Sequence, residues 1–137
     1  MTILGLDIGI KRTGVAISNE ISSLCTPLDY ISSKDNFLEK ISKIIEDKKV
    51  EKIIIGLPKL LSGREGERAK YSRSISNLIK SKHKTIKVIM WDERLTTKQA
   101  EKYLKELDSN KRKIKDKIDS ASAVLILENY LVSKGNL

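Results

Sequence analysis

The chain has 137 residues, of which 39% are hydrophobic and 33% charged, and these proportions predict one globular domain over residues 1–137. A membrane protein is excluded, because no run approaches the roughly 18 apolar residues of a membrane span. The sequence also shows no recognisable signal peptide and no pair of cysteines for a disulfide. We therefore expect a cytoplasmic protein with no membrane partner. The formal net charge of +9 favours a polyanionic partner, of which nucleic acid is the first candidate.

The first quarter of the chain predicts three strands joined by short links. Residues 2–9 and 13–18 are apolar runs separated by a glycine-containing turn, and residues 24–31 suit a third strand. Strands in succession with short links are typical of an antiparallel meander. Pro27 cannot donate a backbone hydrogen bond, so we expect the third strand at an edge of the sheet.

The rest of the chain alternates helical and strand patterns. Apolar residues at helical spacing indicate helices, and short continuous apolar runs indicate strands buried on both faces. The predicted elements are a helix at 35–49, a strand at 52–56, a loop at 56–66, a helix at about 65–82, a strand at 86–91, a helix from Thr96 to about Leu107 and a helix from about Lys115 to Ser133.

This order predicts an α/β fold with a five-stranded mixed sheet. Three antiparallel strands come first, and two parallel strands follow through helical crossovers. Because such crossovers are right-handed, helices should flank both faces of the sheet.

Three acidic positions interrupt apolar patterns. Asp7 lies within the first strand, where a buried carboxylate is costly without a partner. Asp92 and Glu93 follow the last strand, and Asp119 lies on the predicted last helix in line with apolar residues. If these segments converge, three carboxylates can hold one or two Mg²⁺ or Mn²⁺ ions. Paired ions of this kind activate water for phosphodiester hydrolysis.

Each acid also has a purely structural interpretation as a cap, an ion pair or a solvated charge. These alternatives are a turn cap or a pair with Lys11 for Asp7, a pair with Arg94 or a helix cap for Asp92, a solvated charge for Glu93, an exposed position for Asp116 and a first-turn helix acid for Asp119. Together they would leave the apolar settings of Asp7 and Asp119 unexplained.

Four stretches of the chain resemble the YqgF (RuvX) family, which has the RNase H-like fold of the RuvC-type Holliday junction resolvases. They are GLDIGIKRTGVAIS (5–18), IIGLPKLLSGREG (54–66), WDERLTT (91–97) and KIDSASAVLILENYL (117–131). The resemblance implies a nuclease that processes the 5′ end of pre-16S rRNA during ribosome maturation, or a Holliday junction resolvase acting on branched DNA. It also implies an acidic triad, both catalytic and metal-binding, at Asp7, Glu93 and Asp119.

Basic side chains are expected to contact the nucleic-acid backbone. The chain has one Trp, one Phe and four Tyr, which is few for reading bases by stacking and favours recognition of shape and backbone. A solvated basic surface is the alternative. The predicted contacts are Lys11 and Arg12 near Asp7, Lys59 and Arg64 in the loop at 56–66, Arg94, and a basic stripe of Lys111, Arg112, Lys113, Lys115 and Lys117.

Two further classes of function stay open at this level. The first glycine turn resembles the phosphate-binding turn of the actin/Hsp70 ATPases and sugar kinases, although those proteins need two such lobes. A non-catalytic RNA-binding factor of the pre-ribosome would keep the fold without the activity. The sequence does not decide whether the substrate is RNA or DNA. It also does not decide whether the protein is a monomer or a weak homodimer, although a resolvase needs a two-fold dimer for symmetric cutting.

Overall fold

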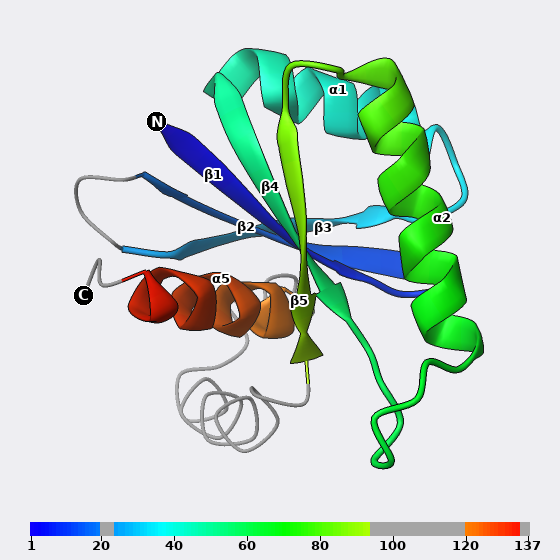
Figure 1. Ribbon diagram of the computed structural model, residues 1–137. Coiled ribbons are helices and arrows are strands. Elements are labelled where there is room, and N and C mark those ends of the chain that lie inside the picture. The colour runs from blue at the N-terminus through cyan, green and yellow to red at the C-terminus, as the bar shows by residue number, and fades with distance from the viewer. Residues whose placement is uncertain (20–23, 94–119, 135–137) are drawn as a thin grey trace, which may run out of the picture.

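The computed structural model describes residues 1–19, 24–93 and 120–134, which form one sheet flanked by helices (Figure 1). The strand order across the sheet is β3-β2-β1-β4-β5, so the predicted five-stranded mixed sheet is confirmed. The elements are β1 (Thr2–Ile8), β2 (Arg12–Asn19), β3 (Thr26–Ser32), α1 (Phe37–Lys48), β4 (Val50–Leu57), α2 (Glu67–Lys82), β5 (Lys87–Asp92) and α5 (Ala121–Ser133).

The first strand lies at the centre of the sheet. β1 pairs antiparallel with β2 and parallel with β4, and β4 pairs parallel with β5. β3 is an edge strand, as Pro27 predicted. Because β1, β4 and β5 run in the same direction, their carboxyl ends share one end of the sheet.

Helices cover the two faces of the sheet unequally. α1 and α2 pack on one face over a core that includes Leu4 and Leu6, while α5 packs on the other face over Ile3 (Figure 1). Gly5 allows a close approach, since an added Cβ would lie 3.0 Å from the Ala123 carbonyl oxygen. Side chains alternate along a strand, so Asp7 shares the α5 face with Ile3 and Gly5.

Two predictions about the second half of the chain were wrong. The last helix begins at Ala121 with Ser120 at its N-cap, six residues after the predicted beginning near Lys115. Serine is a favoured N-cap residue, and the run of small residues that follows it concealed this boundary. β5 is an edge strand whose buried face is only partly covered by the described residues, and not a strand buried on both faces.

Some predictions fall outside the part of the chain that the structure describes. These are the helix from Thr96 to about Leu107 and the basic stripe that follows it. Within the described ranges, every helix is too short or too polar to cross a bilayer.

Candidate functional site

Asp7 and Glu93 meet at the carboxyl end of the parallel strands. Asp7 lies near the end of β1, and Glu93 directly follows β5. Both side chains are half-buried on the α5 face, and a hydrogen bond joins their carboxyl groups. The structure thus brings together two of the three acids that the sequence singled out, whereas Asp119 lies outside the described residues.

Gly56 of β4 is the reason that these two side chains can meet. β4 separates β1 from β5, so their backbones lie two strand spacings apart, about 10 Å. A Cβ on Gly56 would lie 2.8 Å from Cγ and 2.9 Å from Cδ of Glu93. The missing side chain therefore leaves the space through which Glu93 reaches across β4 toward Asp7.

Replacing Gly56 with alanine is expected to separate the two carboxyl groups. The added methyl group would also lie 2.5 Å from Cδ1 of Ile126 on α5, so the helix or Glu93 must move. Overpacking of this kind costs about 1–3 kcal/mol of unfolding free energy, which urea denaturation measures. The matched control is Gly66→Ala, whose Cβ would lie 3.5 Å from the Leu60 side chain, an ordinary contact. Equal stability of the two variants would refute this role of Gly56.

The surroundings of Glu93 raise the pKa of its carboxyl group to about 9. Burial is the largest cause, followed by the negative charge of Asp7 and the hydrogen bond that the protonated Glu93 carboxyl makes to it, and the charge of Asp92 adds a smaller effect. Arg68, in the first turn of α2, acts in the opposite direction and lowers this pKa. Near neutral pH, Glu93 therefore carries a proton and donates it in a hydrogen bond to Asp7.

Sequence reasoning missed both Gly56 and Arg68 as parts of this site. Gly56 was considered only as the last residue of a predicted strand and the first residue of the loop that follows it. Arg68 lies in the first turn of α2, where the helix macrodipole disfavours a positive charge. A cation at such an unfavourable position is the signal that could have identified Arg68 as part of a site.

Ser120 holds the beginning of α5 against the opposite half of the sheet. The pairing of β2 with β3 shifts register between Thr13 and Val15. At this shift the fully buried Ser120 hydroxyl accepts a hydrogen bond from the Val15 amide at 3.0 Å and donates one to the Leu28 carbonyl at 2.6 Å. Asp119 directly precedes this anchored residue in the chain.

Removing the Ser120 hydroxyl with Ser120→Ala leaves two buried backbone groups without this partner. The expected loss is about 1–3 kcal/mol of unfolding free energy, the usual cost of an unsatisfied buried group. Thermal or urea unfolding measures it. Ser74→Ala serves as the control, since that exposed hydroxyl bonds only to the Tyr71 carbonyl one turn earlier in the same helix. A loss no larger than that of the control would contradict the anchoring role.

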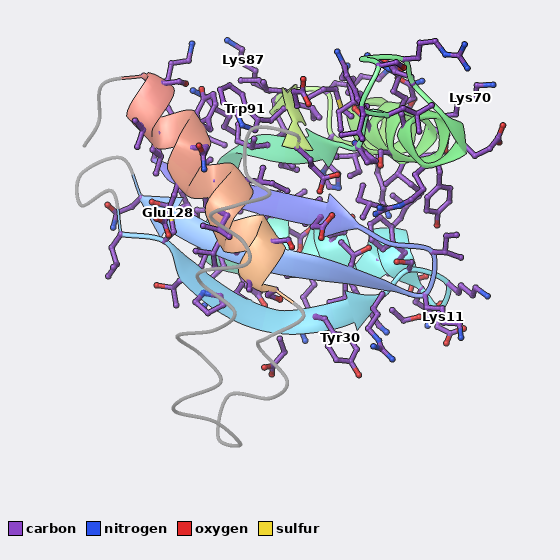
Figure 2. The ribbon with its side chains drawn as sticks, turned by 90° about the horizontal axis from the view of Figure 1, so that it is seen from below. Lys11, Tyr30, Lys70, Lys87, Trp91 and Glu128 are labelled. Atoms are coloured by element: carbon purple, nitrogen blue, oxygen red, sulfur yellow. The ribbon has the colours of Figure 1, made fainter. Side chains whose placement is uncertain are left out.

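Four of the predicted nucleic-acid contacts are described, and they lie on the segments around this end of the sheet. Lys11 is exposed at the β1–β2 turn, and Tyr30 lies on the edge strand β3 (Figure 2). The Arg12 guanidinium stacks over the Tyr30 ring, 5.2 Å from its centroid. Lys59 and Arg64 belong to a hairpin beyond the end of β4. Arg94 and the stripe from Lys111 to Lys117 lie outside the described residues.

The donor chemistry of this pair suits a hard divalent cation. Mg²⁺ and Mn²⁺ prefer carboxylate oxygens. Two hydrogen-bonded carboxyl groups that share a proton can exchange that proton for a metal ion. Among the described residues no three His, Cys, Asp or Glu side chains gather in a metal-binding group. The pair thus fits part of a metal site, with two ligands.

Comparisons with known proteins agree on one family. The family model of RuvX, described as Holliday junction resolvase, matches residues 1–133. A protein of Sulfurihydrogenibium named "Putative pre-16S rRNA nuclease" is 47% identical over 130 residues, covering 94% of this chain and 88% of the relative. A Bacillus subtilis protein of the same name is 38% identical, covering 97% and 99%.

Solved structures show the same fold. RuvC of Thermus thermophilus, solved in complex with a Holliday junction substrate, superposes with a TM-score of 0.60 at 12% identity, covering 99% of this chain and 97% of that one. The expected RNase H-like fold is thereby confirmed.

Proposed function

This chain belongs to the RuvX family, and from that membership we propose that it is a nuclease that hydrolyses phosphodiester bonds with the help of Mg²⁺ or Mn²⁺. The observation that carries the proposal is the meeting of Asp7 and Glu93 across Gly56. A half-buried acid pair in which Glu93 keeps its proton near neutral pH is costly for a fold. Such cost is typical of functional sites rather than of packing.

In this proposal, Asp7 and Glu93 hold the metal, and Asp119 supplies a third carboxylate. Glu93 gives up its proton when the metal binds. The bound ions would activate water and stabilise the leaving oxygen. Arg68 and Lys11 lie where they can contact the substrate phosphate and offset the negative charge of the acids.

The preferred substrate is precursor 16S rRNA at its 5′ end, in keeping with the name that both bacterial relatives carry. The second candidate is a four-way DNA junction, in keeping with the description of the family model. A non-catalytic role on the pre-ribosome is the third. The three candidate functions differ in whether the protein cuts RNA, DNA or neither, and one assay distinguishes them.

The assay compares a precursor small-subunit rRNA fragment with a four-way DNA junction. Each is incubated with the purified protein in Mg²⁺, in Mn²⁺ or in EDTA. We expect cleavage of the RNA in either metal and none in EDTA. Paired, symmetric cuts in the junction alone would favour the resolvase and require a dimer. Tight binding without any cleavage would refute the nuclease and favour the assembly factor.

A further inference from the structure

The hairpin beyond β4, residues 58–66 and called the arm below, projects from the end of the sheet where Asp7 and Glu93 lie (Figure 1). Lys59 and Glu65 pair across it as an antiparallel bridge. Leu60 donates its amide to the Arg64 carbonyl at 2.8 Å, and Gly63 donates its amide to the Leu60 carbonyl at 2.8 Å. Gly63 has a φ of 91°, which suits glycine at the end of a tight turn.

The arm is also fixed to the body of the protein. Arg73 of α2 holds Glu65 through two hydrogen bonds, at 2.6 and 2.7 Å. A bidentate pair of this kind sets orientation as well as distance. The arm is therefore held by its internal ladder at the tip and by α2 at its base.

Leu61 occupies the tip of the arm and is 98% exposed. Single exposed leucines are common on protein surfaces. Leu61 differs from them because a braced hairpin presents it beyond the candidate site, at a turn position that many polar residues would suit. Exposing a leucine forgoes the free energy of burying it, which a partner recovers when it covers the side chain.

The charges around Leu61 indicate the partner. Lys59 and Arg64 flank the tip, and Arg68 follows on the first turn of α2. A polyanion satisfies these cations, and the apolar face available within a nucleic acid is the stacked surface of its bases. Leucine side chains flanked by basic residues enter base steps as wedges and unstack them.

The length of the arm limits how far Leu61 lies from the site. Leu61 is five residues beyond Gly56, so the chain between them spans at most about 17 Å. That upper limit corresponds to about five base steps of a duplex at 3.4 Å each. A wedge on this arm would therefore act within about five base steps of the bond to be cut.

We propose that Leu61 is a wedge that opens the base stack within about five base steps of the scissile phosphate, so that the protein selects substrates whose pairing is weak or interrupted. This inference rests on the proposed nuclease function and adds the basis of substrate choice. Lys59 and Arg64 hold the backbone on either side of the wedge, while Leu61 takes the place of a stacked base.

The test compares Leu61→Ala with wild type on a fully paired helical substrate and on copies with a mismatch at each of the five steps around the cut. We expect cleavage of the paired substrate to fall about tenfold, since alanine is too short to take the place of a stacked base. A mismatch at the wedge step should restore it to within about twofold. RNA and DNA versions show which duplex the wedge opens. Leu78→Ala, which truncates another exposed leucine on α2, is the control.

A second readout follows the bases directly. 2-Aminopurine at the wedge step should brighten when wild type binds in Ca²⁺, and should stay quenched with Leu61→Ala. Equal cleavage and equal fluorescence for both proteins would overturn the wedge while leaving the nuclease intact. A wild-type protein that neither binds nor cuts any of these substrates would instead overturn the nuclease, and the wedge with it.

Discussion

Replacing Asp7 with asparagine is expected to lower the cleavage rate at least about 1000-fold, or about 4 kcal/mol of transition-state stabilisation. Asp7 lies on the central strand and is hydrogen-bonded to Glu93, the other described acid that we propose as a metal ligand. A neutral amide binds Mg²⁺ weakly and cannot neutralise it. Single-turnover cleavage at saturating Mg²⁺ measures the effect.

The Asp7→Asn protein should remain folded, because the change removes a charge that opposes Glu93 ionisation. Asp92→Asn is the matched control: it removes a neighbouring carboxylate that, by strand alternation, points to the other face of the sheet. The control should keep its activity within a few-fold. An Asp7→Asn protein that cuts as well as wild type would show that the site is assigned wrongly.

Replacing Glu93 with glutamine is expected to stabilise the metal-free protein while abolishing cleavage. In the unfolded chain the Glu93 carboxyl has the ordinary glutamate pKa of 4.5, whereas in the folded protein its pKa is about 9. Between these values the unfolded chain releases the proton that the folded protein retains, so stability falls as pH rises. Glutamine carries no charge and can still donate a hydrogen bond to Asp7. We expect a gain of about 1–3 kcal/mol at pH 8 and none at pH 4.5.

Thermal unfolding in EDTA from pH 4.5 to 9 measures this gain. Adding Mg²⁺ should raise the melting temperature of wild type, because the metal replaces the proton, and should leave the Glu93→Gln protein nearly unchanged. Glu128→Gln is the control. Burial raises the pKa of Glu128 as well. Glu128 lies on α5, on the opposite side of Figure 2 from Lys11 and the β1–β2 turn. It should keep full cleavage, and a Glu93→Gln protein that behaves in the same way would exclude Glu93 from the site.

The sequence was sufficient to predict most of the architecture. Apolar runs located the described strands, period-3.6 patterns located the described helices, and the proline in β3 predicted the edge. The same reasoning failed at Ser120, because its hydroxyl bonds to backbone groups of Val15 and Leu28, which are more than 90 residues away in the chain. It also failed at β5, since burial depends on what covers a strand and not on its own composition.

For the site, the chain alone was enough to find the acids that are out of place, because an acid in or directly after an apolar run is a local feature. Asp7 and the neighbours Asp92 and Glu93 were identified in this way, and the family resemblance selected Glu93. The hydrogen bond between Glu93 and Asp7 could be found only in the folded protein, because it requires the parallel pairing of β1, β4 and β5 and the empty space above Gly56. A pKa near 9 is a property of that enclosed pair and of Arg68 beside it. No spacing along the chain encodes it, since desolvation depends on neighbours that folding alone brings together.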